Sequence, residues 1–198
     1  MSPRPRKVTD EQLFTAALAV MNRVGPNELT LAAIAREAGV TPAVLVQRFG
    51  SKRDLLLGLS RKFSDGSGEM VAAFAKQHAS PLAALHAYAD CVAGMAATPA
   101  AFVRNLAYLQ TDLTDPEFRR HLAKHARATR AGLRRLLERA IRAGELASDT
   151  PTARLARTIE AVLSGSMLTW VVYREGSATT WVRADLDAVL GPYSGRSG

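Results

Sequence analysis

The 198-residue sequence predicts an all-α protein, and three observations lead to that prediction. Apolar residues recur at helical spacing through most of the chain. Proline or a hydroxyl residue stands at or near the start of most of these patterns, where helices favour them. No segment alternates as a strand does, and no internal repeat is evident. We therefore expect about nine helices.

Composition and charge bound the class of protein. Hydrophobic residues make up 47% of the chain, which is typical of a globular protein. The formal charge is +8, and residues 1–63 hold ten Lys/Arg against five Asp/Glu. This excess favours a polyanionic partner, although ordinary solubility charge would also explain it.

The cysteine content and the apolar segments further limit the class of protein. Cys91 is the only cysteine, so an intramolecular disulfide and a cysteine-based zinc site are excluded. The basic start is followed by polar residues instead of a signal-peptide core, and the apolar run over 161–173 is too short to span a membrane. We expect a cytoplasmic protein.

The first third of the chain predicts a basic arm and three short helices. Residues 1–9 form the arm, and a helix begins at Asp10 and ends at Gly25-Pro26. A second helix covers 31–38, and Gly39 provides the turn after it. Thr41 and Pro42 are the cap and first residue of a third helix that runs to about Arg48.

The rest of the chain predicts longer helices. One begins at Ser51, and we expect a kink, break or soft point where it contains Gly66 and Gly68. Further helices are expected over 81–97, 99–111, 115–143, 151–175 and 179–190. The predicted domains are 10–60 and 61–191, followed by a disordered tail at 192–198.

The helix pair within 31–50 has the spacing of a helix-turn-helix. In that motif the second helix enters the major groove of DNA, and small residues allow the two helices to cross closely. Ala35, Gly39 and Val40 meet the need for small or apolar residues at the crossing, and Leu45 and Phe49 anchor the second helix. A plain helical hairpin would have the same spacing, so the basic first third is needed to favour DNA binding.

The segment 10–60 resembles the DNA-binding domain of the TetR family of transcriptional regulators. The matching residues are Thr30, Ile34-Ala35, Ala38-Gly39-Val40-Thr41, Leu45, Phe49, Ser51-Lys52 and Leu55. The resemblance implies a homodimer that reads a pseudo-palindromic operator and is released by a small ligand in the C-terminal domain. We expect a repressor, with activation as the alternative, because the position of the operator decides between the two.

The chain departs from the family pattern at Val44, Val46 and Arg48, where the family often has threonine, tyrosine and histidine. The loss of polar groups at the two valines keeps a second hypothesis open. In it, the chain is a dimeric all-helical protein that binds a small molecule or a partner without specific DNA readout.

The predicted DNA contacts divide into base-reading and phosphate-binding residues. Pro42, Ala43 and Val46 can contact thymine methyls, Gln47 can pair with adenine, and Arg48 with guanine or phosphate. The resemblance assigns phosphate to Lys52. Arg53 and the arm residues Arg4, Arg6 and Lys7 would add salt-dependent affinity. The full predicted set is Thr30, Thr41, Pro42, Ala43, Val46, Gln47, Arg48, Lys52 and Arg53.

Aromatic and sulfur-bearing residues of the later helices predict a mostly apolar ligand pocket. An ordinary core would use the same residue types. The predicted pocket residues are Phe74, Tyr88, Cys91, Met95, Phe102, Leu106, Tyr108, Leu109, Met167, Trp170 and Tyr173.

The helix over 151–175 is apolar on two sides, so both must be buried. One side can face the core and the other a second protomer, and the resemblance pairs the last two helices in this way. A fully internal helix is the alternative. The predicted interface residues are Leu155, Ile159, Val162, Gly165, Ser166, Trp181, Leu186 and Val189.

Three remaining features of the sequence indicate function less strongly. The arginine-rich run over 119–142 predicts a solvated face, with an anionic ligand or a second DNA contact as alternatives. His121 and His125 share a helix face, but no third ligand is near, so we predict no metal and no cofactor. No catalytic motif is present, so an enzyme is not expected.

Overall fold

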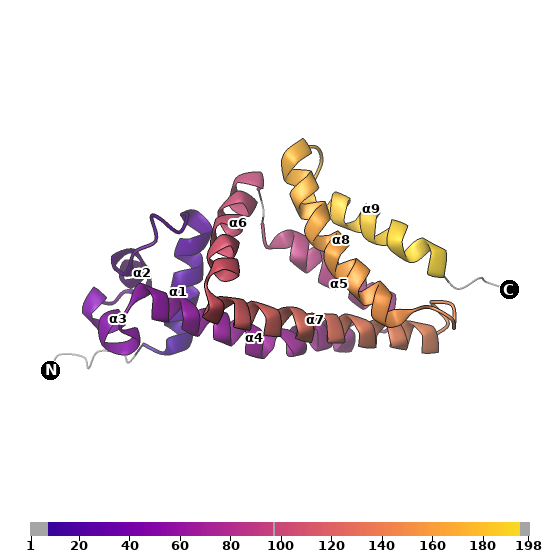
Figure 1. The fold of residues 1–198 in the computed structure, drawn as a ribbon, viewed down its shortest axis with the longest axis horizontal. Helices are drawn as coiled ribbons and strands as arrows, with labels where there is room; N and C mark the ends of the chain where they lie inside the picture. The colour runs from indigo at the N-terminus through magenta and orange to yellow at the C-terminus, as the bar shows by residue number, and fades with distance from the viewer. Residues whose placement is uncertain (1–7, 97, 195–198) are drawn as a thin grey trace. The chain divides into compact units, whose positions relative to one another are not determined.

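A computed structural model describes residues 8–96 and 98–194. In this part of the chain the predicted all-α fold is confirmed, with nine α-helices, one short 3-10 helix and no strand (Figure 1). The helices are α1 (Asp10–Arg23), α2 (Leu31–Ala38), α3 (Pro42–Phe49), α4 (Lys52–Gln77), α5 (Pro81–Gly94), α6 (Pro99–Thr114), α7 (Pro116–Arg142), α8 (Thr152–Tyr173) and α9 (Ala178–Leu190).

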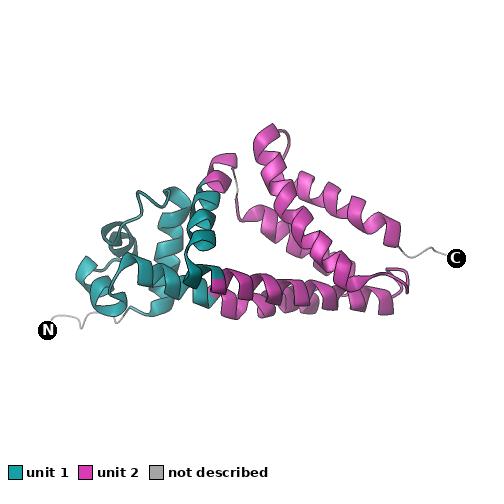
Figure 2. Cartoon of the chain, viewed as in Figure 1, with its two compact units in different colours: residues 1–62, 104–119 teal, residues 63–103, 120–198 magenta. Residues whose placement is uncertain are grey.

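The chain divides into two compact units (Figure 2). Unit 1 comprises residues 1–62 and 104–119, and unit 2 comprises 63–103 and 120–198. The first break lies close to the predicted boundary at 60/61. Residues 104–119, which we expected in the C-terminal domain, group with unit 1 instead.

Unit 1 is built on an aliphatic core. The buried side chains come from α1, the loop after it, α2, α3 and the start of α4, and they include Leu13, Ala17, Leu29, Ile34, Ala35, Leu45 and Leu55. Two long side chains attach α6 to α1. The Tyr108 hydroxyl donates to the Val24 carbonyl at 3.1 Å, and Arg104 Nε donates to the Asn22 carbonyl at 3.1 Å. These contacts explain why 104–119 belongs to unit 1.

In unit 2 the second half of α4 runs parallel to α7. Ser64 meets His121 and Ser67 meets His125, and further along Val71 packs against Gly132. A Cβ at Gly132 would stand 2.8 Å from the Val71 Cβ, so the close approach of the helices requires glycine there. Helices α5, α8 and α9 complete the core, which includes Leu85, Tyr88, Ile159, Met167, Val182 and Leu186.

Two local expectations differ from the structure. Helix α4 continues without a break through Gly66 and Gly68. Ser64 precedes these glycines, Ser67 lies between them, and both serines are buried against α7. Tertiary packing therefore overrides the low helix propensity of glycine.

The end of the chain is also more ordered than expected. Residues Gly191–Tyr193 form a 3-10 helix, and the Tyr193 carbonyl accepts a 2.9 Å hydrogen bond from the Ala147 amide. The rest of the predicted tail, 195–198, and the predicted arm residues Arg4, Arg6 and Lys7 lie outside the described residues.

Candidate nucleic-acid interface and interior polar cluster

The α2–α3 pair has the predicted hinge. The Thr30 hydroxyl caps α2 by accepting a 3.1 Å hydrogen bond from the Ala33 amide. After α2 the chain turns at Gly39, whose φ of 67° and ψ of 30° lie in the left-handed region. Glycine enters this region without steric penalty, so α3 can begin at Pro42 in a new direction.

Helix α3 is anchored on one side and exposed on the other. Leu45 is fully buried in the unit 1 core, and the Phe49 ring lies 5.6 Å from the Phe14 ring, centroid to centroid. The opposite side carries exposed Pro42, Ala43, Val46 and Gln47. Thr41, at the N-cap, is also exposed and its hydroxyl makes no capping hydrogen bond. These five predicted contact residues therefore form one accessible surface.

The predicted phosphate-binding cations are engaged within unit 1. Arg48 pairs with Asp10 at 3.1 Å and donates to the Val8 carbonyl. Lys52 Nζ donates to the Leu29 and Pro26 carbonyls at 3.0 and 3.3 Å. To contact phosphate, these side chains must exchange an internal partner for the ligand.

Arg53 is held by two acids from the second segment of unit 1. Its guanidinium lies 2.8 Å from Asp115 and 2.7 Å from Glu117. Hydrogen bonds to Glu117 and Asp115 raise the pKa of Arg53, and the bond from Arg53 lowers the pKa of Asp115. Sequence reasoning missed these partners, because no local pattern links residue 53 to 115.

The predicted pocket residues do not all lie in one unit. Leu106, Tyr108 and Leu109 belong to unit 1, and the other eight belong to unit 2. Within unit 2, Tyr88, Met167 and Trp170 are buried, and Phe74 and Phe102 pack against the same core. Cys91, Met95 and Tyr173 are exposed instead.

A polar cluster in the interior of unit 2 was not predicted. Ser67 Oγ lies 2.5 Å from His125 Nδ1, and Ser64 Oγ lies 3.3 Å from His121 Nδ1. One turn beyond His125, the buried Thr129 hydroxyl lies near enough to the Tyr88 hydroxyl to oppose the rise of its pKa, but it forms no hydrogen bond of good geometry in the described part of the chain. Unsatisfied buried polar groups are rare in folded proteins.

The electrostatics of this cluster follow from its burial. Burial raises the pKa of the Tyr88 hydroxyl to about 12 and lowers the pKa of His125. Both groups are therefore neutral at pH 7. The spacing of His121 and His125 was visible in the sequence, but their serine partners on α4 were not. The described residues contain no group of three or more potential metal ligands.

The predicted interface residues divide between the core and the surface. Val162, Gly165, Ser166 and Val189 line an open groove of about 820 Å³ between α8 and α9, together with Ala161 and Ala188. Ser166 is itself buried and donates to Asp185 at 2.6 Å across the groove. Leu155, Ile159 and Leu186 point into the core of their own chain, so they are not on the outward face as predicted.

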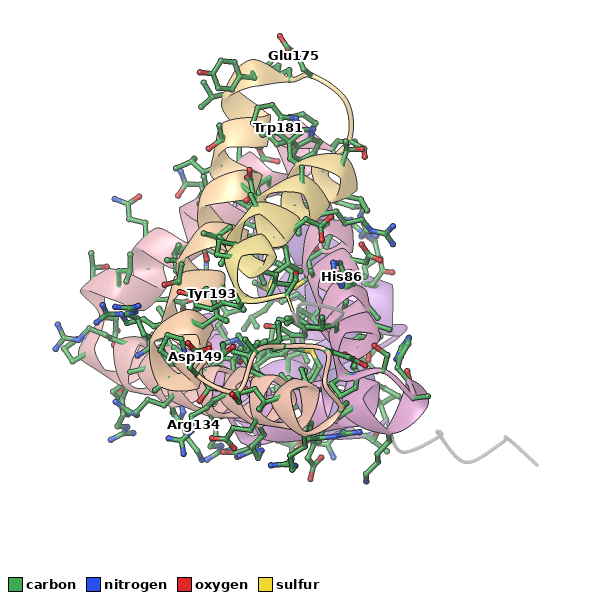
Figure 3. The ribbon with its side chains drawn as sticks, turned by 90° about the vertical axis from the view of Figure 1, so that its right-hand side faces the viewer. His86, Arg134, Asp149, Glu175, Trp181 and Tyr193 are labelled. Atoms are coloured by element: carbon green, nitrogen blue, oxygen red, sulfur yellow. The ribbon has the colours of Figure 1, made fainter. Side chains whose placement is uncertain are left out.

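At the far end of α8 and α9, aromatic residues pack together. Trp181 is half-buried and stacks on Tyr173 at a centroid distance of 5.6 Å. Its Nε1 donates to the carbonyl of Glu175, which lies at the same end of the molecule (Figure 3). Leu168 and Val172 are exposed on α8 nearby. By length and composition α8 could cross a membrane, but a core helix of a soluble protein meets the same criterion.

Comparisons with known proteins agree with this architecture. The chain is similar to SmeT, the repressor of the Stenotrophomonas maltophilia multidrug efflux pump SmeDEF (20% identity, 96% of this chain, 93% of that chain, TM-score 0.69). It is similar to reduced NemR from E. coli (14% identity, 96% of this chain, 100% of that chain, TM-score 0.76). It is also similar to Bacillus subtilis FadR in complex with stearoyl-CoA (18% identity, 91% of this chain, 97% of that chain, TM-score 0.65). No curated protein sequence is a significant match.

Two family profiles match the sequence. Residues 13–59 match "Bacterial regulatory proteins, tetR family", and residues 82–186 match "Tetracyclin repressor-like, C-terminal domain". The first match contains the α2–α3 hinge, and the second contains all of α6, α7 and α8 and most of α5 and α9. The chain belongs to the tetR family of bacterial regulatory proteins.

Proposed function

We propose that this chain is a cytoplasmic, homodimeric transcriptional repressor that binds a pseudo-palindromic operator through α3 and is released by a small, mostly apolar ligand in unit 2. The observation that carries the proposal is the exposed surface of α3, since Leu45 fixes the helix while Thr41, Val46 and Gln47 remain free for DNA.

Base readout would rest on few groups. The Gln47 amide forms no hydrogen bond within the described residues, so it can pair with adenine without breaking an internal contact. Thymine methyls would contact Val46, which is 50% exposed, and Ala43 beside it. Arg48 would contact DNA only after breaking its ion pair with Asp10 and its hydrogen bond to the Val8 carbonyl.

Selection of bound duplexes from a random pool tests this directly. We expect a palindromic consensus with two half-sites about one turn of DNA apart. Gln47→Ala should lower operator affinity by about 5- to 150-fold and relax the preference at one position of each half-site. The matched control is Gln110→Ala, an exposed glutamine on α6. Recovery of no consensus would leave only a ligand- or partner-binding protein.

The ligand would lie among the apolar side chains of unit 2. Tyr88 and Phe74 meet edge to face at 6.1 Å, and Met167 and Trp170 belong to the same core. The hydroxyl of Thr129 would give the ligand one hydrogen-bond partner. Mass spectrometry of the natively purified protein, before and after denaturation, would identify a retained molecule, and adding that molecule should release the operator.

Dimerisation would use the groove between α8 and α9. Its small residues Ala161, Gly165 and Ala188 permit close approach of a second helix pair. Ala161→Arg should therefore convert the dimer to monomers in sedimentation experiments at micromolar concentration. Ala83→Arg, an exposed alanine on α5, is the control and should remain dimeric. Monomeric wild-type protein would refute the proposed assembly.

A further inference from the structure

The unit 2 part of α7 carries a strongly one-sided charge. Residues 120–142 contain eight Arg or Lys and a single acid, Glu138. Its buried positions are filled by small and apolar residues such as Leu133, Leu136 and Ala140, so the cations lie on the remaining faces. Figure 3 shows Arg134 pointing away from the ribbon on this side of the molecule.

Half of these cations have internal partners. Lys124 pairs with Asp65 at 2.5 Å, Arg130 with Glu160 at 2.6 Å, and Arg134 with Glu138 at 2.7 Å. Arg139 donates to the Ala75 carbonyl at 3.0 Å. The remaining four are exposed and form no ion pair within the described residues: Arg120, Arg127, Arg135 and Arg142.

These four arginines define what we call the α7 stripe. They are seven, eight and seven residues apart, so they follow one face of the helix. At about 1.5 Å per residue, neighbouring members are about 10 to 12 Å apart along the axis. The stripe is therefore a row of positive charges about 33 Å long, which is close to one turn of B-DNA.

A shallow hollow beside the stripe adds further cations. It has a volume of about 240 Å³ and a floor of small and apolar residues from α4 and α7, including Val71, Ala72, Ala75, Gly132 and Leu136. Lys76, Arg135 and Arg139 are the charged residues of its lining, and no acid contributes to it. Three cations around one depression can hold an anionic group, and the arginines can do so with two parallel hydrogen bonds.

From these observations we propose that the α7 stripe, with this hollow, is a second contact for the phosphate backbone of duplex DNA. No large hydrophobic side chain of α7 is exposed, which argues against a membrane surface. Its members are all arginine, whose guanidinium matches phosphate geometry. The contact goes beyond operator readout, because it involves no base edge and adds affinity for any sequence.

The test is the salt dependence of binding to a duplex of arbitrary sequence, measured by fluorescence anisotropy. Each lost phosphate contact reduces the slope of log K against log salt by about 0.9. Arg127→Gln/Arg135→Gln should therefore reduce it by about two units. Arg154→Gln/Arg174→Gln removes the same charge from exposed positions elsewhere in unit 2 and should change it by less than about half a unit.

Equal slopes for the two double variants would overturn the proposal. So would an equally α7-dependent affinity for poly-L-glutamate, which would indicate an acidic protein partner instead. Circular dichroism and sedimentation should show both variants folded and dimeric like the wild type. The test is independent of operator readout, since the α7 variant should still select the wild-type consensus while Gln47→Ala should alter it at an unchanged salt slope.

Discussion

The two units differ in where their polar side chains lie, since those of unit 1 are at the surface and some of those of unit 2 are buried. The core of unit 1 is made of aliphatic side chains such as Leu13, Ile34 and Leu45, and its polar groups lie on the surface. The buried polar side chains of the described chain lie in unit 2: Ser64, Ser67, Thr129, Thr150 and Ser166. Under the proposed function, unit 1 presents a surface to DNA, whereas unit 2 would use its interior polar groups to orient a ligand.

The largest effect is expected from a variant that removes a buried side chain from the unit 1 core. Leu45→Ala removes a fully buried side chain and should destabilise the protein by about 2 to 5 kcal/mol in urea unfolding. DNA binding should weaken with it. Val46→Ala, on the exposed side of the same helix, should stay within about 0.5 kcal/mol of wild type. Similar losses from both would contradict the assigned inward face.

Unit 2 can be tested where α4 and α7 meet. Gly132→Ala places a Cβ 2.8 Å from Val71 and should destabilise the protein by about 1 to 3 kcal/mol. Gly68→Ala meets nothing within 4 Å on α4, so it should stabilise the protein by about 0.5 to 1 kcal/mol. Opposite shifts in the urea midpoint are the expected result. A stabilising Gly132→Ala would show that the helices are further apart.

The buried polar cluster gives a finer comparison between two threonines. Thr129→Val replaces a buried hydroxyl, whose contact with Tyr88 lacks good hydrogen-bond geometry, with a methyl group and should raise stability by about 1 kcal/mol. Thr150, 7% exposed, donates to the Ala147 carbonyl at 2.6 Å, so Thr150→Val should lower stability by about the same amount. A destabilising Thr129→Val would mean that the hydroxyl has a partner in solution.

The smallest expected effect is on pH dependence. Burial lowers the pKa of His125 against weaker opposing effects of the Phe63 backbone and Glu160. The unfolded state then binds more protons, so stability falls as pH decreases from about 6.5 toward the folded-state pKa. His125→Asn should lose less stability than wild type between pH 7.5 and 5.5. Identical pH profiles for the two proteins would show that His125 does not cause the pH dependence of stability.

The sequence was informative wherever structure depends on local signals. Pro81, Pro99 and Pro116 mark the first residues of α5, α6 and α7, and Gly39 marks the hinge before α3. Each acts through its own backbone preferences, so its effect could be predicted without knowing its neighbours.

What could not be predicted depends on contacts between distant segments. The unbroken α4 depends on contacts between its buried serines and α7, and the partners of Arg53 lie 62 and 64 positions further along the chain. Periodicity also showed that α8 has two apolar sides without showing which is internal. The structure places Leu155 and Ile159 inside and Val162 at the groove.

The composition of unit 1 from two separated segments has a consequence for synthesis. Residues 8–62 leave the ribosome well before 104–119, so the carbonyls of Asn22 and Val24 must wait for Arg104 and Tyr108. Domains generally fold as units during translation, the N-terminal one first. Here that order cannot be complete, because the α1–α3 head gains its last helix only after part of unit 2 has emerged. Chains truncated before residue 104 would therefore carry an unfinished head.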